Sequence, residues 1–211
     1  MPRSKSHSRN TLVGNAMLQF WEHGYEATSV GNLVSATGVN RGALYADFGG
    51  KRELFLACLS HFQDAAVTPV FADVEAEDAG LAAIEAYLND GVTEIQKFGL
   101  PARGCLMGNT LTELGPHDDE IAKIVNTHYD RLSDGFARAL ANEIDMSPSG
   151  AEIKELAGFL AVSAQGLWAY ARAIDNINDL KKKVRLLIEL VKLKLTAMSD
   201  NTGSKRTGAT A

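Results

Sequence analysis

The chain has 211 residues, of which 45% are hydrophobic and 22% charged, and its formal net charge is −5. This composition is typical of a folded globular protein and excludes an intrinsically disordered chain, and the length allows one or two domains. The two cysteines exclude a disulfide framework and are typical of a reducing compartment.

The first predicted element is a helix that ends at His23 and Gly24. The segment before it is basic, and Arg3, Lys5 and Arg9 are predicted either to lie in a solvated tail or to reach phosphates as a basic arm. Apolar residues recur along the helix at helical spacing: Leu12, Val13, Ala16, Met17, Phe20 and Trp21.

Residues 29–45 form the pattern of two short helices joined by a tight turn. Ser29 is predicted to cap the first helix, because its side-chain oxygen can accept a hydrogen bond from a free amide of the first turn. Gly38 is predicted to end that helix, since glycine adopts a left-handed backbone at little cost, and Asn40 caps the second. The pattern predicts a helix-turn-helix, which places a helix in the major groove of DNA.

A fourth helix is predicted from the apolar stripe Leu54, Phe55, Cys58, Leu59 and Phe62, with Cys58 in the core. The N-terminal pattern as a whole comprises Phe20, Gly24, Tyr25, Thr28, Ser29, Val30, Gly38, Val39, Gly42, Leu44, Tyr45, Phe48, Lys51 and Leu54. Over about residues 9–56 it resembles the N-terminal signature of tetracycline-repressor (TetR) family regulators. Many positions agree over one continuous stretch, which argues against a chance match.

The resemblance implies that the helix after the turn reads bases. Arg41 can donate two hydrogen bonds to a guanine edge. Asp47 stands where the family often has histidine, so it is expected instead to pair with Arg52 or to cap the next helix. The phosphate-binding positions of the family are matched by Thr28, Ser29, Tyr45 and Lys51. The predicted DNA-binding residues are Thr28, Ser29, Asn40, Arg41, Gly42, Ala43, Tyr45 and Lys51.

The net charge divides unevenly along the chain. Residues 1–62 carry six lysines and arginines against four acidic residues, whereas residues 63–200 carry 13 against 22. Attraction to phosphate decays over about 8 Å in physiological salt, so the local balance near the helix-turn-helix matters more than the total. The negative net charge therefore does not exclude DNA binding.

Turn and cap signals predict five further helices, at about residues 78–98, 104–114, 118–143, 151–174 and 180–198. The expected fold is all-α, with about nine helices. A three-helix helix-turn-helix DNA-binding domain (residues 1–56) precedes a helical domain (residues 57–200), to which the resemblance assigns ligand binding and dimerisation. Residues 201–211 are expected to be a disordered tail, because they have almost nothing to bury.

The last two long helices are predicted to form a homodimer. Each carries apolar residues away from its main stripe, such as Phe159, Trp168 and Leu190, so one partner within the chain would not cover both faces. Two copies would close a four-helix bundle. This agrees with the family, whose two-fold dimers present two reading helices to a palindromic operator in double-stranded DNA.

The resemblance also implies a pocket for a small-molecule effector, whose identity the sequence does not provide. Candidate lining residues are Tyr87, Phe98, Met107, Phe159 and Trp168, with core packing as the alternative for each. Cys105 offers a different signal, because Arg103 and a helix start beside it favour a reactive thiolate. A small apolar residue packed at a helix start is the alternative.

Other functions find little support. His117, Asp118, Asp119 and Glu120 are consecutive and point in different directions on a helix, so no metal site is expected. No catalytic motif or phosphate loop is present, so neither an enzyme nor a cofactor is predicted. The apolar stretch 156–171 is shorter than the roughly 20 residues of a membrane span, and no secretory signal is recognised, so a cytoplasmic protein is expected.

The sequence therefore predicts a DNA-binding transcription regulator that binds its operator as a dimer and is released by an effector. Repression is expected rather than activation, because no extra surface for recruiting polymerase is evident. The alternatives are a thiol-based redox repressor that uses Cys105, and a helical ligand-binding module without specific DNA binding.

Overall fold

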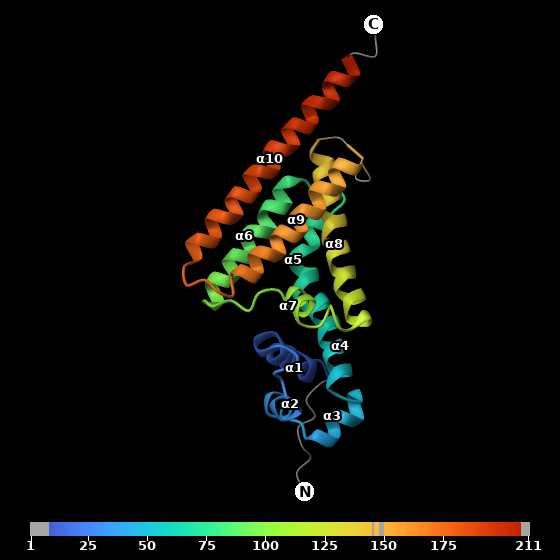
Figure 1. The fold of residues 1–211 in the computed structure, drawn as a ribbon, viewed down its shortest axis with the longest axis vertical. Coiled ribbons are helices and arrows are strands. Elements are labelled where there is room, and N and C mark those ends of the chain that lie inside the picture. The colour runs from blue at the N-terminus through green and yellow to red at the C-terminus, as the bar shows by residue number, and fades with distance from the viewer. Residues whose placement is uncertain (1–8, 145, 148–149, 208–211) are drawn as a thin grey trace. The chain divides into compact units, whose positions relative to one another are not determined.

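The computed structural model describes residues 9–144, 146–147 and 150–207, and every regular element among them is a helix (Figure 1). Counting α4, η1 and α5 as the one continuous helix that they form, these residues contain nine helices, which confirms the predicted all-α fold. The elements are α1 (Arg9–His23), α2 (Val30–Thr37), α3 (Arg41–Phe48), α4 (Lys51–Phe62), the π-helical stretch η1 (Gln63–Val67), α5 (Thr68–Glu75), α6 (Leu81–Phe98), α7 (Leu106–Glu113), α8 (Asp119–Glu143), α9 (Ala151–Tyr170) and α10 (Ile177–Thr207).

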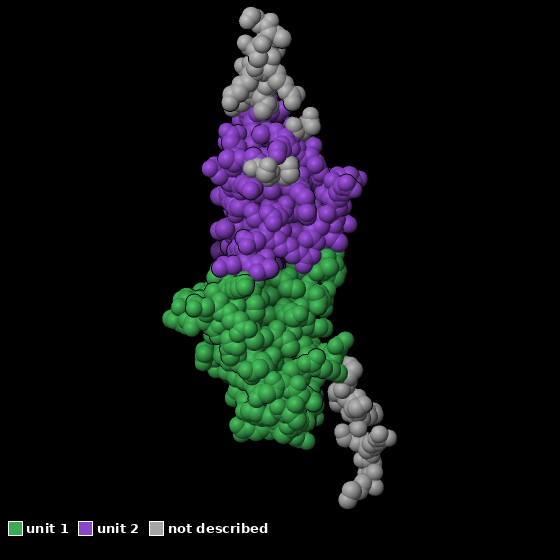
Figure 2. All heavy atoms as spheres, turned by 90° about the vertical axis from the view of Figure 1, so that its right-hand side faces the viewer, with its two compact units in different colours: residues 1–69, 105–125 green, residues 70–104, 126–211 purple. Residues whose placement is uncertain are grey.

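The chain forms two compact units, which Figure 2 distinguishes by colour. Unit 1 comprises residues 1–69 and 105–125, and unit 2 comprises residues 70–104 and 126–211. This division differs from the predicted boundary between residues 56 and 57, which falls inside α4. The physical reason is that α4 continues without a break, and that α7 returns from later in the chain to pack on it.

The core of unit 1 is built where α1 packs on α2 and α4. Phe20 of α1 meets Phe55 of α4 edge to face, with ring centroids 4.9 Å apart. Leu33 of α2 and Leu44 of α3 are fully buried, so all four N-terminal helices contribute to one core. Cys58 also lies in it, as expected: its thiol donates to the Val13 carbonyl, and burial raises its pKa.

The run Lys51–Glu75 is long and apolar enough to match a membrane span by length and hydropathy alone. Its packing is that of a core helix, because Leu54, Phe55, Leu59 and Phe62 are buried in unit 1.

The core of unit 2 contains an aromatic cluster from three helices. The ring of Phe71 in α5 packs edge to face on Tyr87 of α6 and on Phe136 of α8, at centroid distances of 5.2 and 5.4 Å. Trp168 of α9 lies against Gly91 of α6, where a Cβ atom would come within 2.5 Å of the indole ring. Glycine at position 91 therefore allows α6 and α9 to approach closely.

The two ends of the chain stand differently against the sequence expectation. Arg3 and Lys5 lie outside the described residues, whereas Arg9 begins α1 and its guanidinium lies over the Phe48 ring, 4.9 Å from the centroid. Helix α10 continues to Thr207, so residues 201–207 are helical although their composition predicted a disordered tail. A helix can extend there because its backbone amides bond within the helix and need no apolar partner.

Candidate DNA-binding site

Both ends of α2 have the caps that the sequence predicts. Ser29 has an extended backbone and its Oγ accepts from the Asn32 amide at 3.1 Å, while Asn32 Oδ1 accepts from the Ser29 amide at 2.9 Å. At the other end Gly38 has φ 72° and donates its N–H to the Val34 carbonyl. This left-handed residue reverses the chain, so that α3 starts three residues later.

Helix α3 is capped by Asn40, whose Oδ1 accepts from the Ala43 amide at 2.9 Å. The helix has only eight residues and depends on tertiary packing for stability. Fully buried Leu44 and nearly buried Phe48 provide that packing on one face. The opposite face is exposed at Arg41, Gly42 and Tyr45, so the helix presents a side suited to a DNA groove.

The exposed face carries one cation that is already oriented. The Arg41 guanidinium lies 5.7 Å from the centroid of the Tyr45 ring, on the next turn of α3. Tyr45 is itself 41% exposed, so the pair is open to solvent. Ala43, the residue expected to contact a thymine methyl, is only half-buried.

The four predicted phosphate contacts differ in accessibility. Ser29 and Tyr45 are exposed, and the ammonium of half-buried Lys51 lies 4.1 Å from the centroid of the Tyr25 ring. Thr28 is fully buried and its hydroxyl donates to the Gly24 carbonyl at 2.7 Å. The Thr28 side chain therefore holds the turn before α2, and a phosphate contact by this hydroxyl would require that bond to break.

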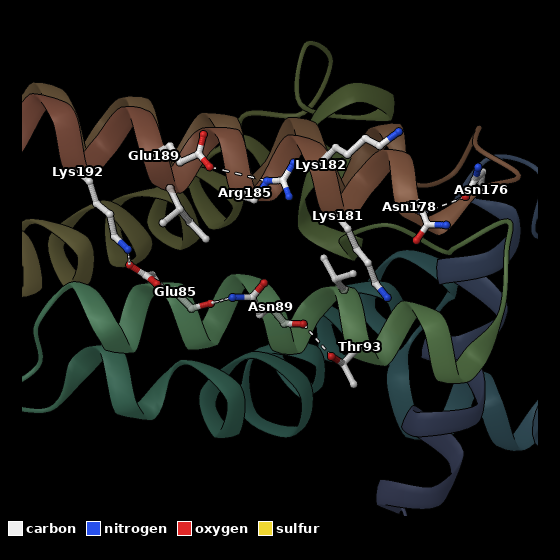
Figure 3. A pocket seen from close by; sticks show the side chains of 12 residues that line it. Glu85, Asn89, Thr93, Asn176, Asn178, Lys181, Lys182, Arg185, Glu189 and Lys192 are labelled. Carbon is white, nitrogen blue, oxygen red and sulfur yellow. Dashed lines mark hydrogen bonds and ion pairs between the residues drawn. The ribbon is translucent and has the colours of Figure 1, made fainter.

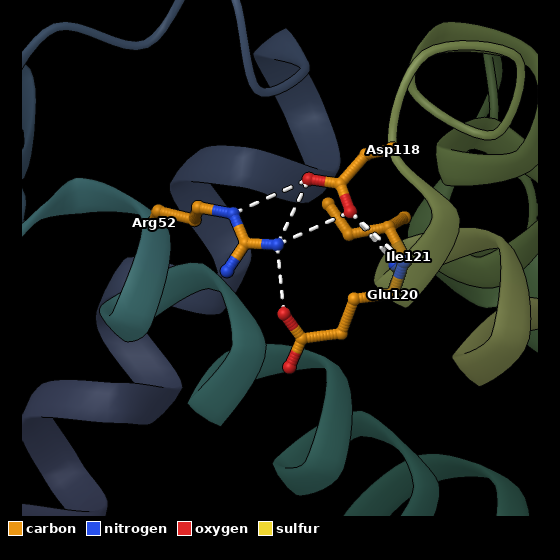
Figure 4. A network of polar contacts seen from close by, with 4 residues as sticks. All are labelled: Arg52, Asp118, Glu120 and Ile121. Atoms are coloured by element: carbon orange, nitrogen blue, oxygen red, sulfur yellow. Dashed lines mark hydrogen bonds and ion pairs between the residues drawn. The ribbon is translucent and has the colours of Figure 1, made fainter.

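The expectation for Asp47 is wrong in both of its forms. Arg52 binds Asp118 and Glu120 instead, with its Nη2 atom 2.9 Å and 2.8 Å from their carboxylate oxygens (Figure 4). The N-cap residue of α4 is Gly50, and no side chain caps that helix. Asp47 remains exposed on α3, because the carboxylates that reach Arg52 come from a segment 66 residues later.

Asp118 has a second role beside its contact with Arg52. Its Oδ1 accepts from the Glu120 and Ile121 amides, both at 3.1 Å, which satisfies free N–H groups at the start of α8 (Figure 4). The Ile121 amide, and then Arg52, hold the pKa of the Asp118 carboxyl below its usual range. Hydrogen bonds to the Glu120 and Asp118 carboxylates in turn raise the pKa of Arg52.

Sequence reasoning missed Glu113, which binds the turn between α1 and α2. Its carboxylate accepts from the Tyr25 amide at 3.0 Å and from the Glu26 amide at 2.8 Å. Gly24, with φ 84°, allows this approach, because a Cβ there would lie 3.0 Å from a Glu113 oxygen. No local pattern could have indicated the contact, since the partners are almost ninety residues apart.

The five candidate effector-pocket residues are not brought together. Met107 is fully buried in unit 1, and Tyr87 and Trp168 pack in the core of unit 2. Phe98 and Phe159 are 78% and 55% exposed, so neither lines an enclosed pocket in this chain. Buried Met107 and Trp168 and half-buried Tyr87 have contacts of core packing, the alternative that the sequence left open.

A polar groove of about 790 Å³ lies in unit 2 between α6 and α10 (Figure 3). An ion pair of 2.6 Å between Lys192 and Glu85 closes it on one side, and Lys181 donates to Gln96 at 2.9 Å. None of the five candidate effector residues lines it.

Cys105 is the N-cap residue of α7 and is 8% exposed. It forms no disulfide, and neither does Cys58. The described part of the chain contains no group of three or more His, Cys, Asp or Glu side chains that could hold a metal ion.

Comparison with known proteins agrees with this geometry. Residues 12–58 match the family model described as bacterial regulatory proteins, tetR family. The HTH-type transcriptional repressor ComR of Escherichia coli K12 is 33% identical over 203 residues, which cover 90% of this chain and 93% of ComR. The chain belongs to the TetR family. It is therefore a DNA-binding transcriptional regulator.

Further relatives of this TetR family regulator cover most of its length. The uncharacterised HTH-type regulator YezE of Bacillus subtilis 168 is 28% identical over 90% of this chain and 100% of its own. A cysteine mutant of the TetR family regulator CifR, solved with operator DNA, has a TM-score of 0.75 at 23% identity and covers 89% of this chain and 98% of its own. The reduced form of E. coli NemR has a TM-score of 0.71 at 16% identity, and the match covers 85% of this chain and 94% of the NemR chain.

The Glu113 contact leads to a first prediction. Glu113→Ala removes the acceptor of two backbone N–H groups in the turn before α2, so the free energy of unfolding should fall by about 1–3 kcal/mol. Urea denaturation followed by circular dichroism measures this change. The control Asp73→Ala removes an exposed carboxylate from α5 and should leave the urea midpoint within experimental error of the wild-type value. Equal midpoints for the two variants would contradict a structural role of Glu113.

Proposed function

We propose that this TetR family regulator is a repressor that binds a palindromic operator as a homodimer and leaves it when a small molecule binds unit 2. The observation that carries the proposal is the exposed face of α3, where Arg41 and Tyr45 project from a helix anchored by buried Leu44. Such a face can enter a major groove while its anchor keeps the side chains in register. We infer no catalytic role, and we place the protein in the cytoplasm with the DNA that it binds.

Repression is supported by the relatives. ComR, and AcnR of Corynebacterium glutamicum, which is 46% identical over 25% of this chain, are named transcriptional repressors. The CifR chain was solved on double-strand operator DNA. Bases would be read by Arg41, Gly42 and Ala43, and phosphates would be held by Ser29, Tyr45 and Lys51, with Asn40 fixing the start of α3.

Dimerisation is supported by apolar side chains that the chain leaves uncovered. Val162 of α9 is 64% exposed, and Leu190 and Leu193 of α10 are 48% and 68% exposed. Together with Phe159 and Leu186 they follow one another at three- and four-residue intervals along one side of each helix. Trp168, which the sequence analysis placed with this surface, is buried within the chain instead. Two copies that pair α9 and α10 would bury both strips in a four-helix bundle.

A two-fold dimer of this kind explains why the operator should be a palindrome. Its two α3 helices would reach half-sites about 34–36 Å apart, one turn of DNA, or a multiple of that distance. An effector that favours another spacing of the heads would lower operator affinity, and a coupling of about 1–3 kcal/mol changes occupancy appreciably. The continuous helix from α4 into α5 supports such coupling, because it contains residues of both units.

Truncation of Arg41 should change the sequence preference of DNA binding, whereas truncation of Lys51 should change the affinity for any DNA. Arg41→Ala should reduce the preference for operator over scrambled DNA by about 1–3 kcal/mol, whereas Lys51→Ala should weaken binding to both and reduce the salt slope by about 1. Fluorescence anisotropy with the DNA upstream of the gene, at several salt concentrations, measures both quantities. Arg138→Ala, an exposed site in α8 outside the interface, is the control and should behave as wild type. A wild-type protein without any preference would favour the ligand-binding module as the function.

The dimer surface has its own test. Leu190→Asp places a charge in the proposed apolar interface, so sedimentation at micromolar concentration should report a monomer and operator affinity should fall at least tenfold. Val70→Asp makes the same kind of change at a 50% exposed site in α5 and should remain dimeric. A Leu190→Asp protein that stays dimeric and binds the operator normally would refute this interface.

A thiol sensor at Cys105 is the second candidate. It is favoured by the position of Cys105 at the N-cap of α7, where the helix dipole stabilises a thiolate. If this mechanism operates, diamide should release wild-type protein from the operator and Cys105→Ser should stay bound, as a gel shift measures. Cys58→Ser is no suitable control because Cys58 lies in the core. Equal release of wild type and Cys105→Ser by the oxidant would exclude the thiol mechanism.

A further inference from the structure

Two polar side chains lie inside unit 2, where α8 and α9 pack in the core. His128 of α8 is 2% exposed and Gln165 of α9 is 6% exposed. Their Nε2 atoms are 3.5 Å apart. In the described part of the chain, the Oε1 atom of Gln165 has no hydrogen-bond partner and is closed off from solvent.

The missing partner does not depend on how the amide is oriented. Turning the Gln165 amide by half a turn would bring its Oε1 atom to His128, and a neutral ring that carries its proton on Nε2 could donate to it. The NH₂ group of Gln165 would then lose its contact with His128 instead. A buried polar group left unsatisfied costs about 1–3 kcal/mol. Such a group in a folded protein points to a bound water or ligand that completes it.

The charge that acts on the buried His128 ring is that of Arg131. Burial, and then the positive charge of Arg131, lower the pKa of His128 to about 4, so the ring is neutral at physiological pH. Arg131 in turn is bound by both carboxylate oxygens of Glu75, at 2.7 and 2.6 Å. Burial of a charged ligand here would carry a high desolvation cost, and the charge of Arg131 is already bound by Glu75.

The side chains beside Gln165 on the buried face of α9 are apolar. Ala161 and Ala164 precede it and Trp168 follows one turn later, all 8% exposed or less. On α8, fully buried Leu132 lies one turn after His128. Apart from the indole N–H, these four side chains offer a ligand only carbon surface. The Tyr129 ring meets the His128 ring edge to face, with centroids 5.9 Å apart.

We propose that Gln165 and His128 form the polar end of the effector site in unit 2, which takes an uncharged, largely apolar molecule with a hydroxyl group, such as a phenol. A hydroxyl both donates and accepts, so it completes the Gln165 amide in either orientation. The inference rests on the proposed control by an effector and adds the chemical class of that effector and the residues that recognise it.

The test compares phenol with toluene, which has nearly the same shape but no polar group. Titration calorimetry on the full-length protein without DNA should show phenol binding about tenfold more tightly than toluene. Gln165→Met keeps the side-chain length and removes both polar atoms, so phenol should lose about tenfold in affinity and toluene should lose none. Gln96→Met, at an exposed position of α6, is the matched control and should bind both probes as wild type does.

The melting temperature provides a second readout. Gln165→Met removes the unsatisfied Oε1 atom but also takes the 3.5 Å contact from the buried His128 Nε2 atom, so the two effects oppose each other and its melting temperature without ligand should stay close to that of wild type. Equal affinities of wild type for phenol and toluene would overturn the proposal, and so would undiminished phenol binding by Gln165→Met. A crystal soaked with phenol that contains only a water beside Gln165 would do the same. If Gln165→Met does not fold, the wild-type comparison of the two probes decides alone.

The binding test and the function test are independent. Phenol affinity is measured without DNA, and release from the operator is measured by adding phenol to the anisotropy assay. Phenol that binds as expected while the operator stays bound would leave the site intact and count against effector control. A protein that never binds an operator would refute the proposed function, while the calorimetry would still decide the site.

Discussion

The packing of Leu44 against the helices around it is the constraint on which DNA recognition depends. An eight-residue helix such as α3 cannot hold its shape alone, because too few of its hydrogen bonds lie within the helix. Leu44 is fully buried, as is Leu33 from α2, and the caps at Ser29, Gly38 and Asn40 set where each helix begins and ends. The direction of the exposed face follows from this anchoring, since side chains on opposite faces of a helix cannot both be buried in one core.

The DNA-binding helices are held by more than their own segment of chain. Glu113 accepts from two amides of the turn before α2, and Asp118 binds Arg52 of α4 while it caps α8. These carboxylates make residues 105–125 part of unit 1 in contacts as well as in packing. Polar contacts at the end of α7 and at the start of α8 therefore connect this later segment to the turn before α2 and to α4.

The two long C-terminal helices divide their surfaces between two tasks. One face of α10 buries Val184, Val191 and Leu195 within the chain. The other exposes Leu190 and Leu193, which a second copy would cover. Helix α9 does the same and in addition buries Gln165, a residue whose polarity a purely structural core would not require.

Local patterns were sufficient to predict the all-α fold, the helix-turn-helix with its three caps, and the family, because caps and apolar periodicity depend on residues within a few positions of one another. Contacts between distant segments could be decided only by the tertiary structure: Glu113 at the turn before α2, and Arg52 with Asp118 rather than Asp47. The complete burial of Thr28 was decided in the same way. Phe98 and Phe159 looked like pocket residues because hydrophobicity alone does not distinguish a buried side chain from an exposed one. Burial is a property of the packed chain, and His128 and Gln165 meet because α8 and α9 pack side by side, which no local pattern of either helix encodes.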